Sequence, residues 1–256
     1  MSQPASPILA KLRASLEAIE GRSTAPVAAL PFGIPGLDAR LAHDGLRIDA
    51  LHEVAAARAG WGDDAAATLF LAGIAARSSG PILWIVRRRD LFAPGLYQAG
   101  LAPERLIHAE ARDDAELLAI MEDALRHRGL GAVIGEAKRV SMSATRRLQL
   151  AAEGGGTLAL LLKRHIRADD DPLGQPSAAT TRWRIAPAPS APLHVGGVAV
   201  EGIGRARWQV ELVRQRGGAS FELMLEACDA TGRCAVAAEL VDRPDLGGRA
   251  DTRAAA

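Results

Sequence analysis

Residues 52–74, HEVAAARAGWGDDAAATLFLAGI, carry an apolar strand pattern into a turn of small residues and then into an alanine-rich helix pattern. This order is typical of a phosphate-binding loop, in which a strand delivers a glycine-rich turn to the N-terminus of a helix. Gly60 and Gly62 lie in the turn, but the Gly-Lys-Ser/Thr run of such loops is missing. The stretch therefore predicts an α/β unit, and its side chains must decide whether that unit binds a nucleotide.

Apolar runs and helical patterns alternate around this stretch. Strands are predicted at 50–56, 81–86, 105–110, 130–136 and 157–164. Helices are predicted at 65–77, 113–129 and 143–154, the first of them opened by Asp63 and Asp64. Continuous apolar strands that alternate with helices favour an α/β fold with a mainly parallel sheet flanked by helices.

The pattern changes after residue 167. Residues 168–179 and 189–206 have the composition of loops, whereas strand patterns recur at 180–188, 207–218 and 220–240. Turns at Gly217 and near Gly232 would join the later strands in antiparallel order. The sequence therefore predicts an antiparallel C-terminal extension of the sheet.

The two ends of the chain differ from the 30–241 domain. Residues 6–21 predict an N-terminal amphipathic helix, and an extended linker completes the segment 1–29. The apolar face of this helix consists of Leu9, Leu12, Leu16 and Ile19. We expect this face to bind a partner protein or to fold back on the chain's own core, since a short isolated helix is marginal in water. Residues 242–256 have no core-forming pattern and predict a disordered tail.

Charge and cysteine content restrict the cellular setting. The formal net charge is +1, which gives no general attraction to nucleic acid or membranes. No secretory signal or membrane-spanning run is recognised, so a cytoplasmic protein is expected. Cys228 and Cys234, on either side of a predicted turn, are then expected to be free thiols.

Seven stretches, in order between residues 30 and 218, together resemble one family. They are LPFGIPGLD, ALHEV, DLFAPGL, LAPERLIHAEARDDAE, SATRRLQLAAE, PSAATTRWRI and RWQVELVRQRGG. The resemblance is to ImuA, the RecA-like accessory proteins of bacterial SOS mutagenesis cassettes. It implies a RecA-like core in which Pro35 begins a short helix ahead of the phosphate-loop strand.

The resemblance also implies a function and partners. The expected role is that of a non-catalytic adaptor in error-prone translesion DNA synthesis, which links a RecA recombinase filament to an ImuB-like polymerase-family protein and an error-prone DNA polymerase. Self-association is a further expectation. Two alternatives stay open: a divergent ATP-dependent single-stranded DNA-binding protein of the RecA superfamily, and an SOS cell-division inhibitor.

The loop residues argue against ATP chemistry. No lysine lies between Lys11 and Lys138, so the loop has no cation of the usual kind for the β- and γ-phosphates. Asp63 and Asp64 would repel a polyphosphate, and Thr68 is expected to pack within its helix. We therefore expect a degenerate phosphate loop at Gly60, Gly62, Asp63, Asp64 and Thr68, with no catalytic residue, cofactor or metal.

Other polar residues could contact ligands or partners. Glu136, at a predicted strand end, could hold Mg²⁺, pair with Lys138, or be a plain rim charge. DNA or a partner could contact the predicted strand-end arginines, which are Arg87, Arg88, Arg89, Arg164 and Arg167. Asp169, Asp170 and Asp171 oppose a phosphate backbone, so nucleic-acid binding is expected to be weak or indirect. The six histidines lack metal-ligand spacing, and those on strands, His52 and His108, are expected to be hydrogen-bonded core groups.

Overall fold

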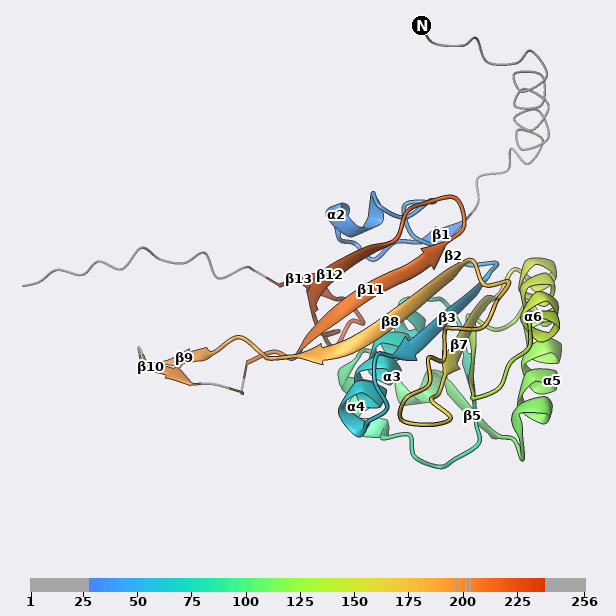
Figure 1. Cartoon of the computed structure of the whole chain (residues 1–256), viewed down its shortest axis with the longest axis horizontal. Coiled ribbons are helices and arrows are strands. Elements are labelled where there is room, and N and C mark those ends of the chain that lie inside the picture. Colours follow the sequence, from blue (N-terminus) through green and yellow to red (C-terminus); the bar gives the residue numbers. More distant parts are fainter. Residues whose placement is uncertain (1–27, 197, 201, 203, 238–256) are drawn as a thin grey trace, which may run out of the picture.

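Nine strands form one sheet in the computed structural model, which describes residues 28–237 apart from Gly197, Glu201 and Ile203. The strand order is β13-β12-β11-β8-β3-β7-β6-β4-β5 (Figure 1). The parallel strands are β3 (Leu51–Ala56), β4 (Ile82–Val86), β5 (Leu106–Glu110), β6 (Ala132–Ala137), β7 (Leu158–Lys163) and β8 (Thr181–Ala188). This arrangement confirms the predicted parallel sheet.

Three strands extend the sheet in antiparallel order, as predicted. They are β11 (Arg207–Gln215), β12 (Phe221–Glu226) and β13 (Ala235–Val236). Gly217 and Gly232 both have positive φ, at 82° and 73°, which only glycine adopts readily in such turns. Along β8, Trp183 and Ile185 point into the core and are fully buried.

Helices cover both faces of the sheet (Figure 1). Helices α3 (Trp61–Ala76) and α4 (Ala93–Gln98) lie on one face, while α5 (Asp114–Leu125) and α6 (Met142–Gly155) pack together on the other. The Asp113 carboxylate caps α5 by accepting from the Glu116 N–H at 2.9 Å. Helix α6 runs one residue beyond the predicted Gly154 and ends where Gly156 turns left-handed.

The sheet separates two apolar cores. The core under α3 and α4 contains Phe70, Trp84 and Trp183, and the core under α5 and α6 contains Leu117 and Met121. In β3, β6 and β7 every residue is buried. Burial on both faces explains why these strands appear in the sequence as continuous apolar runs.

Short elements complete the described fold. β1 (Ala29–Leu30) pairs with β2 (Leu46–Arg47), and α2 (Pro35–Asp38) begins at the predicted proline. A single-turn 3-10 helix, η1 (Pro103–Arg105), precedes β5. The Asp38 carboxylate accepts from the backbone N–H groups of Phe32, Gly33 and Ile34, which fixes the approach to α2.

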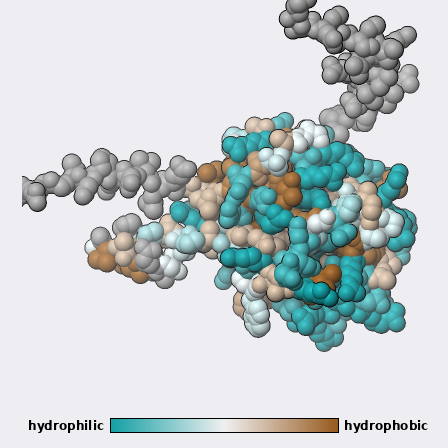
Figure 2. Space-filling view, in the orientation of Figure 1, coloured by the Kyte–Doolittle hydropathy of each residue, from teal (hydrophilic) through white to brown (hydrophobic). Residues whose placement is uncertain are grey.

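One predicted loop is wrong. Within 189–206, β9 (Leu193–Val195) and β10 (Val198–Val200) pair as an antiparallel hairpin that extends away from the main sheet (Figure 1). Leu193, Val195 and Val198 are exposed, and apolar surface is visible on this projection (Figure 2). Strands of three residues around a glycine turn are too short to give a period-2 signal, which is why the sequence suggested a loop.

Two predicted segments lie outside the described residues. These are the N-terminal helix that carries Leu9, Leu12, Leu16 and Ile19, and the tail 242–256. Among the residues that the structure describes, no helix is long and apolar enough to cross a bilayer.

Candidate functional site

The turn after β3 consists of residues 57–60 and leads into α3. The helix begins at Trp61, earlier than predicted, so Gly62 lies in the helix and not in the turn. The Ala57 N–H donates to the Ile185 carbonyl at 2.8 Å, so the turn is tied to β8. Gly60 has extended backbone angles, and a Cβ added there would meet no atom within 4 Å. Neither packing nor backbone geometry therefore requires glycine at this position.

Two carboxylates occupy the first turn of α3. Asp63 is buried and lies 3.3 Å from Arg58 Nε, while Asp64 lies 3.0 Å from Arg164 Nη1. Carboxylates stabilise a helix N-terminus, where the backbone N–H groups and the helix dipole attract negative charge. The N-terminus of α3 therefore stabilises Asp63 and Asp64, whereas in a phosphate-binding loop it would stabilise a phosphate group.

Arg164 is the centre of this site. Its Nη2 and Nε donate to one oxygen of Glu136 at 2.7 and 3.0 Å, and its Nη2 also donates to the Thr68 hydroxyl at 3.2 Å. Together with the ion pair to Asp64, these contacts join β6, β7 and α3 through one guanidinium. The Arg164 side chain is only 19% exposed, so it is a fixed internal group.

The strand order explains how Arg164 and Glu136 meet. β6 and β7 are parallel neighbours. Arg164 follows β7 at the same edge of the sheet at which Glu136 is the last but one residue of β6. The Arg164 N–H donates to the Ala137 carbonyl at 2.9 Å and so fixes the start of the side chain. Burial disfavours the charged guanidinium, but the Glu136 and Asp64 carboxylates outweigh this and raise the pKa of Arg164 above its ordinary value.

Both oxygens of Glu136 have partners. One accepts from Trp84 Nε1 at 2.8 Å and the other from Arg164. The expected alternative of a pair with Lys138 is wrong, since Lys138 is exposed and Arg164 is the cation. Among the described residues, no group of three or more His, Cys, Asp or Glu side chains could hold a metal ion. Glu136 would have to leave Arg164 before it could bind Mg²⁺.

Thr68 differs from its expected packing role. Its hydroxyl donates to the Asp64 carbonyl at 2.8 Å and accepts from Arg164. The Arg164 guanidinium, which follows β7, is thus held by two carboxylates and a hydroxyl next to the first turns of α3. Two surface hollows, of about 360 and 460 Å³, lie elsewhere on the described molecule, one between α5 and α6 and one beside β5.

The structure separates the five candidate arginines into two groups. Arg164 points inward, whereas Arg87, Arg88, Arg89 and Arg167 are exposed. Arg87 pairs with Asp114 at 2.9 Å, and Arg89 pairs with Glu110 at 2.7 Å. Within the described part of the chain, Arg88 and Arg167 have no carboxylate partner. The internal ion pairs of Arg164 favour a structural role over the expected contact with DNA or a partner.

The two strand histidines have different environments. His52 is fully buried, with Nδ1 2.7 Å from the Thr181 hydroxyl and Nε2 2.8 Å from the Arg47 carbonyl, as expected for a core group. Burial lowers the pKa of His52 to about 4, so this imidazole is neutral at physiological pH. His108 lies on the edge strand β5 and is exposed, so the core position expected for it is wrong.

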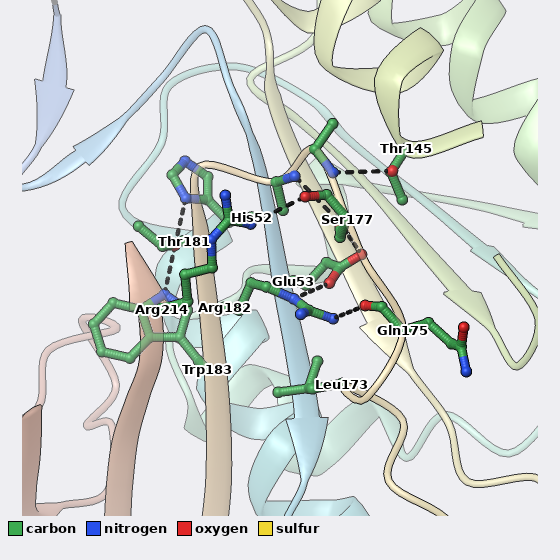
Figure 3. A network of polar contacts seen from close by, with 12 residues as sticks. His52, Glu53, Thr145, Leu173, Gln175, Ser177, Thr181, Arg182, Trp183 and Arg214 are labelled. Carbon is green, nitrogen blue, oxygen red and sulfur yellow. Dashed lines mark hydrogen bonds and ion pairs between the residues drawn. The ribbon is translucent and has the colours of Figure 1, made fainter. Parts of the chain in front are cut away.

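A second polar network holds the loop 168–179 (Figure 3). The fully buried Glu53 carboxylate accepts from Arg182 Nε and from the Ser177 hydroxyl, both at 2.7 Å. Arg214 Nη1 donates to the Ser177 carbonyl at 3.0 Å. The acids earlier in the loop are also paired: Asp170 accepts from the Ile166 N–H, and Asp171 lies 3.3 Å from Arg184. The loop is therefore anchored to β3, β8 and β11.

Sequence reasoning missed both networks. It assigned Arg164 to possible ligand contacts and did not single out Glu53 or Ser177. A signal for the Arg164–Glu136 pair was present, because opposite charges followed two apolar strands that later proved to be neighbours. No sequence signal connected Ser177 with Glu53, which lie 124 residues apart.

Comparisons with known proteins identify the family and the fold. No protein-family model matches the chain. Protein ImuA from two strains of Caulobacter vibrioides, NA1000 / CB15N and ATCC 19089 / CIP 103742 / CB 15, is 40% identical over 220 residues, which cover 83% of this chain and 88% of the relative. The crystal structure of the RadB recombinase aligns with a TM-score of 0.56 at 13% identity and covers 81% of this chain and 99% of that chain, which shows a RecA-like fold. The chain belongs to the ImuA family.

Proposed function

We propose that this chain is a non-catalytic RecA-like adaptor of SOS-induced error-prone translesion DNA synthesis. In this role it links a recombinase filament to an ImuB-containing mutagenic polymerase complex in the cytoplasm. Membership of the ImuA family supports the general setting, and the RecA-like fold supports a connection to recombinases. The adaptor role and the named partners are the parts that experiment must test.

The observation that carries the non-catalytic part is the Arg164 site. ATP hydrolysis in this class of fold needs a cation on the phosphates, a Mg²⁺ ligand and a group that positions water. In this chain the loop has no lysine, the carboxylate at the end of β6 is paired with Arg164, and Asp63 and Asp64 occupy the helix N-terminus. These contacts stabilise a closed loop and disfavour a polyphosphate.

Binding surfaces support a role in protein assembly. We propose that residues 1–29 form a partner-binding segment, because Leu9, Leu12, Leu16 and Ile19 offer about 1.5–3 kcal/mol each on burial before ordering costs. The aliphatic side chains of the β9–β10 hairpin add exposed apolar surface, which often marks an interaction site.

A pull-down experiment tests the proposal. The full chain is immobilised and offered purified RecA recombinase and the ImuB-like partner, each with and without ATP and Mg²⁺. We expect both proteins to be retained. We expect their retention not to require ATP binding by this chain. Retention of neither partner would contradict the adaptor role. Retention only with ATP, when the recombinase is absent, would favour the ATP-dependent alternative.

A further inference from the structure

The two cysteines lie in contact, away from the Arg164 site. Cys228 follows β12 and Cys234 precedes β13, and their Sγ atoms are 3.2 Å apart in a thiol hydrogen bond. The turn between them is held by the Asp229 side chain, which accepts from the backbone N–H groups of Thr231 and Arg233 at 2.8 and 3.1 Å. The sulfur–sulfur contact is thus part of a closed, hydrogen-bonded turn.

This turn packs closely on the helical layer, which keeps the two sulfurs together. A Cβ added at Gly73 of α3 would lie 2.2 Å from Cys228 Sγ, and one added at Gly100 would lie 2.3 Å from the Gly232 nitrogen. Both cysteines are half-buried, so part of each residue is open to solvent. The packing leaves little room for the sulfurs to separate.

A cation lies beside the pair. Arg77 donates from Nε to the Gly73 carbonyl at 3.3 Å, and its guanidinium lies 4.8 Å from the centre of the Phe32 ring. Among the described residues no carboxylate forms an ion pair with Arg77, and burial lowers its pKa while the neighbouring thiols raise it. A guanidinium close to a thiol stabilises its thiolate form.

The two thiols are not equivalent. The contact between the two sulfurs lowers the pKa of Cys234, and Arg77 and Arg205 lower it further, while the same contact and burial raise the pKa of Cys228. The direction of these shifts makes Cys234 the more readily ionised sulfur of the pair.

We propose that Cys228 and Cys234 form a peroxide-reactive dithiol that closes to a reversible disulfide. The Cys234 thiolate attacks one peroxide oxygen, so that an S–O bond forms, the O–O bond breaks and hydroxide leaves as water after protonation. Cys228 then loses its proton and attacks Cys234 Sγ; the S–S bond forms and the S–O bond breaks with release of a second water. Two thiols are oxidised and one hydrogen peroxide is reduced to two waters.

The disulfide would hold β12, β13 and the turn between them together. The bond needs a sulfur–sulfur distance of about 2.05 Å, so the thiols have only to approach by roughly 1 Å. The bridge would join the end of β12 to the start of β13 and hold the turn on α3. A thiol reductant such as dithiothreitol would reverse the reaction.

Thiol counting on the intact chain tests the proposal directly, since Cys228 and Cys234 are its only cysteines. After treatment with one equivalent of hydrogen peroxide, we expect the two reactive thiols to disappear, the monomer to lose the mass of two hydrogen atoms, and dithiothreitol to restore both. Thiols that persist, or a disulfide only between molecules, would overturn the proposal.

Single variants test the assigned roles. Cys228→Ala should leave a sulfenic acid on Cys234 that dimedone traps, whereas Cys234→Ala should react at least about tenfold more slowly with peroxide. Cys228→Ser is the matched control, because its hydroxyl can still donate to Cys234. Alkylation of Cys234 at about pH 7 should be faster in the serine variant than in the alanine variant. Equal rates, or a faster Cys228, would contradict the assignment of Cys234 as the thiolate and Cys228 as its donor.

Discussion

Arg164 donates two hydrogen bonds to a single carboxylate oxygen of Glu136, at 2.7 and 3.0 Å. The pair lies where β6 and β7 end side by side, and it is connected to α3 through Asp64. The RadB recombinase shares this fold. In the present chain, Arg164 joins the three elements around the position of the phosphate loop.

Loss of Arg164 should destabilise the protein. Arg164→Met would leave the Glu136 carboxylate buried beside Trp84 without a cation, and breaking a buried ion pair costs about 3–5 kcal/mol. Urea unfolding should show a loss of about 3 kcal/mol. Arg167→Met, an exposed control, should change the free energy of unfolding by less than about 0.5 kcal/mol. Equal small effects in both variants would mean that the Arg164 pair is not structural.

The same ion pair predicts a rescue. Removing both charges, in Arg164→Met with Glu136→Leu, should recover part of the stability lost in the single variant, since two apolar groups need no desolvation of charge. The measurement is again urea unfolding. A double variant that is less stable than Arg164→Met would contradict this reason for the loss.

Stability should depend on pH through His52. Its pKa is about 4 in the folded protein and 6.5 when unperturbed, so the unfolded chain binds a proton in this window while the folded protein does not. Stability therefore falls as the pH drops from about 6.5 towards about 4. Since one pKa unit corresponds to about 1.4 kcal/mol, we expect His52 to contribute about 2 kcal/mol of loss by about pH 5.

A single variant isolates this effect. His52→Gln should reduce the difference between the free energies of unfolding at about pH 7.5 and about pH 5, because it removes the buried imidazole. An unchanged pH dependence in His52→Gln would rule out a buried neutral imidazole.

Much of the fold follows from the order of apolar runs. The parallel strands and the turns at Gly217 and Gly232 each had a local signal, because burial and positive φ act on neighbouring residues. The short β9–β10 hairpin had no such signal. In the described structure, β9 and β10 pair only with each other and are not part of the main sheet. Their sequence therefore lacks the alternation of apolar and polar residues that would predict a strand.

The candidate site was only half predictable. The missing lysine and the acids at the helix start are visible in the sequence, and they argued against ATP. The closing contacts could not be derived, since Arg164 meets Glu136 and Thr68 across 28 and 96 residues. Such pairs depend on the strand order β3-β7-β6, which many permutations of the same elements would change.

We predict that the N-terminal segment binds another molecule, either a recombinase or a second copy of this chain. Leu12→Asp with Leu16→Asp should keep a near-wild-type melting temperature and lose recombinase binding or self-association, because charge on the apolar face prevents its burial. Circular dichroism and pull-down are the measurements. A variant that unfolds, or one that binds every partner as before, would show that the helix belongs to the chain's own core or has no docking role.

The C-terminal end should be dispensable for folding. Removing residues 243–256 takes away no apolar period, so the melting temperature should change by less than about 2 °C. Differential scanning calorimetry of the truncated and complete chains measures this. A large drop would mean that these residues dock on the fold.

Calorimetric titration of the complete chain with ATP and Mg²⁺ tests the central claim most directly. Arg164, Glu136 and Asp64 satisfy one another, and the loop has no lysine to receive the β- and γ-phosphates. We predict no saturable heat and no ATP turnover above background. A dissociation constant in the low micromolar range, or measurable hydrolysis, would contradict the claim that the contacts of Arg164 with Glu136 and Asp64 prevent nucleotide binding.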